Sequence, residues 1–139
     1  RYVVPIIQVQ ESLKPKKEDV VSVAESGEVL MLRGRSFPIY RLQKLLKRSK
    51  AGSRSAVHEG IALVCEDGNK GGFAILVDEI MSQQQIVIKS LGQEINGFKG
   101  ISGAAILGDG KASLILDLRE ITDHFRNPKN QYTNYKEVA

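Results

Sequence analysis

The chain has one cysteine, no tryptophan, two histidines and few aromatic residues, which make up 6% of its 139 residues. Cys65 alone excludes a disulfide within the chain, and this is consistent with a reducing compartment. No apolar run approaches the ~20 residues that a membrane-spanning helix requires, and no signal-peptide pattern opens the sequence. We therefore expect a soluble, cytoplasmic protein.

What is present is a moderately apolar, mildly basic sequence. Hydrophobic residues make up 42% and the formal net charge is +4, so a core can form and the charge falls well short of a nucleic-acid-binding stripe. Short β-branched apolar runs separated by turn residues indicate an all-β barrel or sandwich. The predicted strands are Tyr2–Ile7, Val20–Ala24, Glu28–Arg33, Ser36–Tyr40, Ile61–Glu66, Gly72–Val77, Gln85–Lys89, Gly103–Leu107 and Ala112–Leu116.

One layout of strand, turn and strand occurs twice. In the segment 101–118, Asp109-Gly110 joins two apolar runs and predicts a tight hairpin with both turn residues at positive φ. In the segment 29–42, Arg33-Gly34 takes the same place. A short helix is predicted directly after the last strand of each copy, on the helical spacing of Leu42, Leu45 and Leu46 and of Leu118, Ile121 and Phe125.

The repeat extends to the strands that open each half. Tyr2–Val9 aligns with Phe73–Ile80, because an aromatic residue opens both apolar runs. The strand Ile61–Glu66 precedes the second of these and has no counterpart before Arg1. We therefore expect a strand upstream of this sequence, without which the edge of a barrel is open to strands of other chains.

Two polar segments set the expected domain organisation. A domain over 1–126 is predicted to consist of a first barrel half (1–46), a basic linker (47–59) and a second barrel half (60–126). The segment 127–139 is expected to be a polar tail. Because half of this length is marginal as a domain, the two halves should share a core.

Residues that bind metals elsewhere are not clustered in this sequence. His58 and His124 lie far apart and only Cys65 is available to join them, whereas a zinc site needs three or four clustered ligands. The favoured interpretation is ordinary histidines and a small buried cysteine. No metal and no cofactor are predicted.

The acidic residues Asp78, Glu79, Asp117 and Glu120 could in principle act in acid–base pairs. Nothing in the sequence places two of them together with a nucleophile, so no catalytic residue is predicted, and Asp117 is better interpreted as a helix N-cap. The glycine-rich segment 68–72 lacks the ending of a phosphate-binding loop and leads into a strand. It is expected to be a hairpin turn.

The basic linker raises an alternative function, that of a small β-barrel nucleic-acid-binding module. Lys47, Arg48, Lys50 and Arg54 could contact phosphates. Barrels that bind single strands also use aromatic stacking platforms, and this segment has no aromatic residue. A solvated linker is favoured, and retention on single-stranded nucleic acid over a salt series would discriminate the two.

Several of these motifs together resemble a known family. The combination of Tyr2-x-x-Pro5-Ile6, Leu32-Arg33-Gly34, Phe37-Pro38-Ile39 and the run Gly103–Gly110 is similar to the CheW-like domain. The long run and the Asp117-Leu118 close resemble the C-terminal regulatory domain of the CheA family of bacterial chemotaxis histidine kinases more than the free adaptor CheW. The resemblance covers about Arg1 to His124, and the long basic linker and the polar tail depart from the pattern.

The resemblance implies two intertwined five-stranded SH3-like barrels and a domain without chemistry of its own, ATP site or cofactor. Such a domain binds the adaptor CheW and the helical tips of chemoreceptors, and so couples receptor state to autophosphorylation of the rest of the kinase chain. It lies in the cytoplasm beside membrane receptor arrays and inserts into no membrane. A free-standing CheW-type adaptor remains the alternative within the family.

The resemblance also favours a partner-binding site at the first hairpin. Arg33 is the leading candidate, because an arginine in this turn can pair with a partner carboxylate while its stem covers apolar surface. An ordinary turn arginine is the alternative. The predicted partner-binding residues are Arg33, Gly34, Val4, Ile6, Val29 and Met31, and the predicted structural turn residues are Gly34, Asp109 and Gly110.

Overall fold

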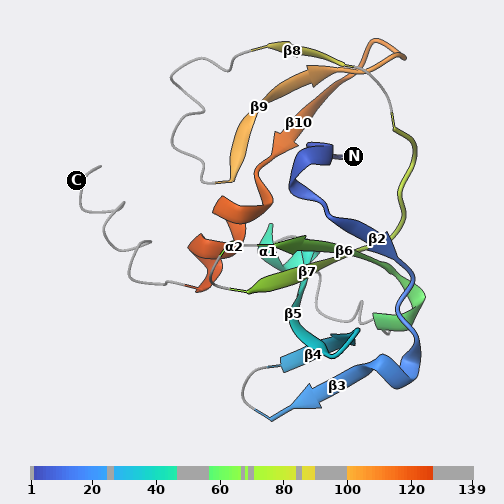
Figure 1. Ribbon diagram of the computed structural model, residues 1–139. Coiled ribbons are helices and arrows are strands. Elements are labelled where there is room, and N and C mark those ends of the chain that lie inside the picture. Colours follow the sequence, from blue (N-terminus) through green and yellow to red (C-terminus); the bar gives the residue numbers. More distant parts are fainter. Residues whose placement is uncertain are drawn as a thin grey trace, which may run out of the picture. The chain divides into compact units, whose positions relative to one another are not determined.

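The computed structural model describes residues 2–24, 27–46, 57–66, 68, 71–83, 86–89 and 100–126. The chain forms two compact units (Figure 1), of which one consists of Arg1–Pro5 and Gln83–Ala139 and the other of Ile6–Ser82. Each unit contains one β-sheet and a short helix.

The strands are β1 (Tyr2–Val3), β2 (Glu11–Leu13), β3 (Val20–Val23), β4 (Gly27–Leu32), β5 (Arg35–Arg41), β6 (Ile61–Glu66), β7 (Gly72–Val77), β8 (Val87–Lys89), β9 (Ile101–Ile106) and β10 (Ala112–Leu116). The helices are α1 (Leu42–Leu45) and α2 (Leu118–Arg126), with the 3₁₀ turns η1 (Ile6–Gln8), η2 (Lys17–Asp19) and η3 (Val57–Glu59). The prediction of a mainly β protein with two short helices is confirmed.

The unit Ile6–Ser82 holds a six-stranded sheet in the order β2-β6-β7-β5-β4-β3. Its buried core comprises Leu30, Phe37, Ala62, Val64 and Ala74, and Leu13, Val20, Leu32 and Ile39 pack against it. Leu13 lies on β2 and Val20 on β3, at opposite ends of the strand order. Because both pack on one core, the sheet curls so that its two edges approach the same interior.

The other unit holds a four-stranded sheet in the order β1-β10-β9-β8. The helix α2 follows β10 after one residue, Asp117, which acts as its N-cap: the Glu120 backbone N–H donates to Asp117 Oδ1 at 3.1 Å. The Asp117 N–H in turn donates to the Gly100 carbonyl oxygen at 2.8 Å. The predicted N-cap is therefore confirmed.

The two sheets repeat one pattern of strand pairing. In one unit β7 runs parallel to β5 with Ala74 opposite Ile39; in the other β1 runs parallel to β10 with Val3 opposite Ile115. Ile39 and Ile115 hold equivalent places after their two turns, and Val3 and Ala74 hold equivalent places in the aligned opening strands. The repeat found in the sequence therefore recurs in the register of the sheets.

The division between the units differs from the predicted halves 1–46 and 60–126. The strands β6 and β7 belong to the sheet that contains β2 and β5, because β2 pairs with β6 and β5 pairs with β7. Within the predicted linker 47–59, Val57 is buried at 3% exposure and begins η3. The rest of that linker, 47–56, and the predicted tail, 127–139, lie outside the described residues.

Strands β6, β7 and β10 have the predicted bounds, whereas the first strand is shorter than predicted. Only Tyr2–Val3 is a strand, and the chain turns into η1 at Ile6. Pro5 explains the difference, because proline has no backbone N–H to donate to a sheet. The strand β2 was not predicted; with three residues, Glu11–Leu13, it is too short to show alternation.

The two hairpin turns have different geometries. Arg33 and Gly34 both have positive φ, 50° and 77°, as a two-residue type I′ turn requires. At the second turn Gly110 has φ 82° and Asp109 does not have positive φ, so the prediction of two positive φ values there is wrong. The Gly110 N–H donates to the Leu107 carbonyl oxygen at 2.9 Å, and the loop is three residues long with glycine in the left-handed position, the usual alternative to a two-residue turn.

Candidate partner-binding surface

The turn between β4 and β5 places Arg33 at the end of a hairpin. Leu32 pairs with Arg35 across the two strands, so only Arg33 and Gly34 are left to reverse the chain. Among the non-glycine residues that the structure describes, Arg33 alone has positive φ. A left-handed backbone at a residue with a Cβ is unfavourable, and such positions are concentrated at functional sites.

The side chain of Arg33 is exposed and forms a two-pronged ion pair with Glu11 of β2. Its Nη2 atom donates to Glu11 Oε1 at 2.7 Å and its Nη1 atom to Glu11 Oε2 at 2.9 Å. The Arg33 side chain is 71% exposed and that of Glu11 33%. Solvent therefore screens the pair, but the planar match of guanidinium and carboxylate fixes the direction of the arginine.

The hydrogen bonds that Arg33 donates to the Glu11 carboxylate, followed by the negative charge of Glu11, raise the pKa of Arg33. A group whose pKa is raised in the folded state contributes stability below its ordinary pKa and loses it only as the pH passes the raised value. Both values lie far above neutral pH for a guanidinium. The pair therefore orients a cation that is permanently charged under physiological conditions.

An apolar strip covers the outer face of β3 and β4. Val21 lies opposite Val29 in the antiparallel register, and Val23 and Met31 continue the same face because side chains alternate along a strand. Val21, Val23 and Met31 are 45%, 44% and 40% exposed. We call Val21, Val23, Val29 and Met31 the outer apolar strip.

The structure brings four of the six predicted partner-binding residues into one hairpin: Arg33, Gly34, Val29 and Met31. Ile6 lies on η1 with 61% exposure, outside the hairpin. Val4 is half-buried and belongs to the other unit. Sequence reasoning missed the partner of Arg33, Glu11, because β2 was not predicted. It also missed Val21 and Val23, whose strand was predicted without an assigned face.

The residues considered for metal binding or catalysis lie at separate places in the fold. The Cys65 thiol is buried and lies 3.8 Å from the Leu63 carbonyl oxygen. Asp78 accepts a hydrogen bond from Gln43 at 3.0 Å. His58 is half-exposed on η3, and the side chain of His124 lies outside the described residues.

In the described part of the chain, no group of three or more His, Cys, Asp or Glu side chains could hold a metal ion. The turn predicted over 68–72 joins antiparallel strands, since β6 and β7 pair as far as Glu66 opposite Gly72. The basic residues Lys47, Arg48, Lys50 and Arg54 lie outside the described residues. None of the described helices is long and apolar enough to span a bilayer.

The two β-rich units, one of which carries the exposed β4–β5 hairpin, agree with the family that the sequence comparison identifies. The sequence profile of the CheW-like domain matches residues 1–126, and the chain belongs to that family. The family resemblance inferred from the motifs is therefore confirmed.

Within that family the chain is similar to chemotaxis kinases. It is 33% identical over 117 residues to chemotaxis protein CheA of Klebsiella aerogenes, which covers 84% of this chain and 18% of the relative. It is 35% identical over 119 residues to CheA of Rhizobium meliloti, with 86% and 15% covered. Sensor histidine kinase CheAY of Helicobacter pylori is 30% identical over 133 residues, with 95% and 16% covered. The chain thus spans less than a fifth of the length of these relatives.

A solved structure shows the same fold. The scaffolding protein TtCheW from Thermoanaerobacter tengcongensis superimposes with a TM-score of 0.63 at 20% identity, covering 84% of this chain and 81% of that one. The predicted fold class, all-β with SH3-like barrels of the CheW-like type, is confirmed by this match.

Proposed function

We propose that this chain is a non-catalytic docking and signal-coupling domain of a bacterial chemotaxis sensor histidine kinase. In this proposal it binds the adaptor CheW and the helical tip of a chemoreceptor, and thereby regulates autophosphorylation elsewhere in the kinase chain. The observation that supports it most directly is the 30–35% identity to CheA proteins over more than four fifths of the chain. The domain would act in the cytoplasm, beside receptor arrays.

The hairpin supplies a surface that suits this role. Arg33 offers an oriented guanidinium, which binds carboxylates with two parallel hydrogen bonds. Val29 and Met31 lie on the strand that leads into the turn and offer apolar area for burial. Gly34 permits the turn, and Val4 and Ile6, which lie outside this hairpin, stay predictions from the resemblance.

Docking becomes signalling only if the partner binds two states of the kinase with different free energies. We therefore propose that a receptor tip contacts the hairpin differently in its two signalling states. The difference in binding free energy would shift the kinase between active and inactive arrangements. A partner that bound both arrangements equally would hold the kinase in place without regulating it.

The substitution Arg33→Glu in the full-length kinase tests this proposal. It reverses the charge at position 33 and places a second carboxylate beside that of Glu11. We therefore expect receptor-coupled autophosphorylation to fall by about tenfold or more. The basal autophosphorylation of the kinase alone should be unchanged, because no residue of this domain is proposed to act in catalysis.

Lys111→Glu is the matched control. Lys111 is exposed and follows the equivalent hairpin turn of the other unit, so it carries the same change of charge at a comparable place. If Arg33→Glu and Lys111→Glu show the same receptor-coupled autophosphorylation, the assignment of Arg33 as a partner-binding residue is contradicted.

A further inference from the structure

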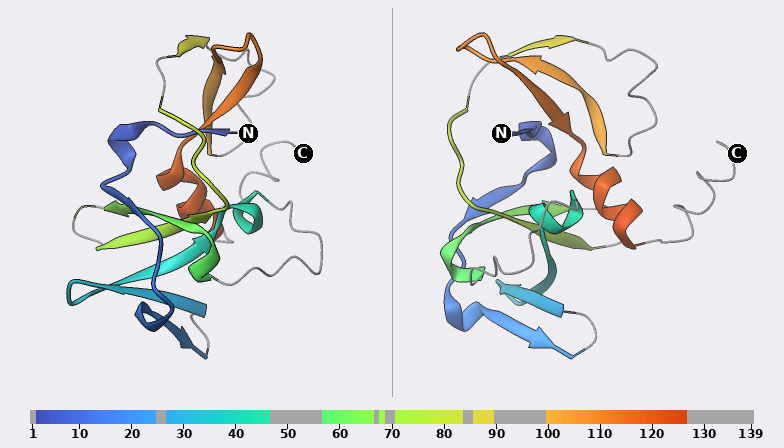
Figure 2. Two further views of the ribbon diagram at one scale, coloured as in Figure 1. Left: turned by 90° about the vertical axis from the view of Figure 1, so that its right-hand side faces the viewer. Right: turned by 180° about the vertical axis from the view of Figure 1, so that it is seen from behind.

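In the part of the chain that the structure describes, one edge of the strand β3 is unpaired. This strand is the last in the order β2-β6-β7-β5-β4-β3 and pairs only with β4 among the described elements. Figure 2 shows β3 and β4 side by side at the end of their sheet. Its sequence, Val-Val-Ser-Val, contains none of the proline or lysine residues that usually protect a sheet edge from other strands.

The two faces of this edge strand differ in chemistry. On the outer face, Val21 and Val23 are exposed and belong to the outer apolar strip. On the inner face, Val20 packs against the core, and Ser22 lies opposite Glu28 of β4. A strand added beyond β3 would place alternate side chains on these two faces.

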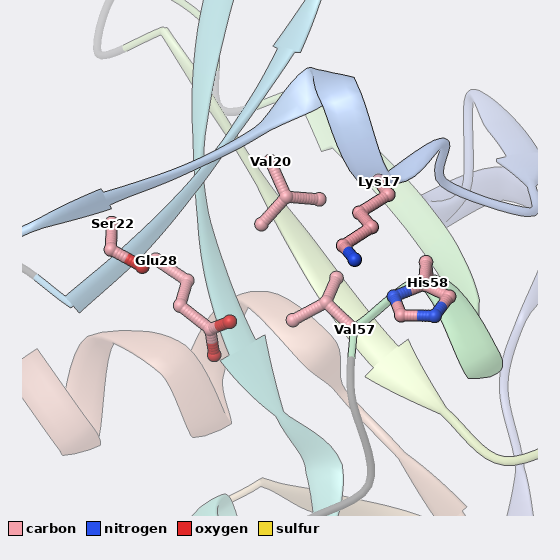
Figure 3. Close-up of a pocket in the computed structure, with 6 residues that line it drawn as sticks. All are labelled: Lys17, Val20, Ser22, Glu28, Val57 and His58. Carbon is pink, nitrogen blue, oxygen red and sulfur yellow. The ribbon is translucent and has the colours of Figure 1, made fainter.

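A hollow of about 320 Å³ opens on the inner face (Figure 3). The residues that line it are Lys17, Val20, Ser22, Glu28, Val57 and His58. In Figure 3 the Lys17 ammonium and the His58 ring lie near Val57, and the Glu28 carboxylate lies on the other side of the hollow. The hollow therefore combines an apolar wall with charged groups at two separate places.

The charges around the hollow are unequally compensated. Arg41 Nη2 donates to Glu28 Oε1 at 3.1 Å, so the arginine compensates the charge of this carboxylate within the protein. The side chains of Lys17 and His58 make no hydrogen bond or ion pair with any other residue in the described ranges. The Lys17 ammonium is thus a cation without a charged partner in the described ranges, and it fits a carboxylate on a short aliphatic stem.

We propose that the free edge of β3 and this hollow together bind an extended segment of a partner protein in which apolar and acidic residues alternate. The backbone of the segment pairs with β3, its apolar side chains cover Val21 and Val23, and a glutamate or aspartate side chain enters the hollow beside Lys17 and His58. This site is separate from the Arg33 turn, and its existence does not depend on the proposed function.

The test uses capped peptides of about eight residues, the usual length range of a strand, with valine and glutamate in alternation. Binding to the whole chain is measured by fluorescence anisotropy against the same peptide with glutamine for glutamate. We expect the glutamate peptide to bind at least about fivefold more tightly, since a charge-assisted hydrogen bond is lost in the glutamine peptide. Lys17→Gln should abolish that preference, whereas Lys14→Gln, at an exposed lysine that does not line the hollow, should retain it.

Backbone pairing is tested on the peptide, so that the protein is left intact. Two peptides are made, one methylated at the odd-numbered backbone nitrogens and the other at the even-numbered ones. In an added strand, only every second N–H group points toward β3 and pairs with it, so methylation blocks the pairing in only one of the two peptides. We expect one methylated peptide to lose binding and the other to retain it. The proposal is overturned if neither unmethylated peptide binds, if Lys17→Gln keeps the glutamate preference, or if both methylated peptides bind alike. Because the assay contains no receptor or kinase activity, these results leave the proposed function to its own experiment.

Discussion

Gly34 and Arg33 share one turn but respond to substitution for different reasons. Gly34 has φ 77°, and a Cβ built on it would meet no atom within 4 Å. The cost of a side chain at this position is therefore a backbone cost alone, since the left-handed region disfavours residues with a Cβ.

Gly34→Ala should accordingly lower the free energy of unfolding by about 1 kcal/mol. Gly34→Asn should cost less, because asparagine tolerates the left-handed region better than other non-glycine residues. Urea denaturation of the two variants and the parent measures this order. A larger loss for asparagine than for alanine would show that space around the turn, and not its φ, sets the cost.

Thr122 has a buried hydroxyl group that lacks a hydrogen-bond partner among the described residues. It lies on α2 with 1% exposure, and its hydroxyl has no hydrogen-bond partner in the part of the chain that the structure describes. A buried polar group without a partner loses its hydration and gains nothing in return.

Thr122→Val should therefore raise the free energy of unfolding by about 1 kcal/mol, since valine keeps the shape and removes the hydroxyl. Thr122→Ser is the control: it keeps the hydroxyl and deletes a methyl group, so it should destabilise the protein. Thermal unfolding measures both. A valine variant less stable than the parent would show that the hydroxyl is hydrogen-bonded in solution.

At the scale of elements, β5 and β7 approach closely where Gly72 begins β7. A Cβ on Gly72 would lie 2.8 Å from a ring carbon of Phe37 and 2.7 Å from the Cys65 carbonyl oxygen. Phe37 is 3% exposed and belongs to the core. The absence of a side chain at Gly72 thus allows β6, β7 and the Phe37 ring to pack together.

Gly72→Ala should destabilise the unit by about 1–3 kcal/mol through this overlap. The neighbouring Gly71 has φ 87° and no atom within 4 Å of a built Cβ, so Gly71→Ala tests the backbone cost alone, about 1 kcal/mol. Chemical denaturation of the two variants compares them. No loss of stability in Gly72→Ala would indicate that the Phe37 ring and the Cys65 carbonyl move aside without cost, because Gly72 has no positive φ to add a backbone penalty.

The elements also show what sequence patterns can and cannot predict. Apolar runs bounded by glycine gave the bounds of β6, β7 and β10, because burial on a sheet demands such runs. The pattern also located both hairpins. It did not distinguish a two-residue turn from a three-residue turn at Asp109-Gly110, since Gly108 can belong to either the strand or the loop. Nor did it predict β2, whose three residues are fixed by pairing with β6.

The candidate surface was predicted in part. The turn pattern alone left an ordinary arginine as an open alternative, and the family resemblance favoured Arg33, Val29 and Met31 as partner-binding residues. The bond to Glu11 was not predictable, because it joins residues 22 positions apart through a strand that the pattern missed. Long-range pairing of this kind is set by tertiary structure.

At the scale of the whole molecule, the order β7-β5-β4-β3 in one unit recurs as β1-β10-β9-β8 in the other. The division of the chain into these units does not follow the sequence order of the predicted halves. The strands β6 and β7 join the first hairpin, and β1 joins the second. This exchange follows from parallel pairing, which needs a long connection between the paired strands. A strand therefore pairs with a partner distant in sequence, and the repeat alone does not show which partner that is.

The central proposal is that this domain docks into a chemotaxis signalling complex, and calorimetric titration with the cognate CheW tests it most directly. We predict saturable binding with a dissociation constant of about 1 µM or tighter, which corresponds to about −8 kcal/mol. A folded sample that gives no binding heat at several concentrations and temperatures, or that binds single-stranded nucleic acid with a steep salt dependence instead, would contradict the account.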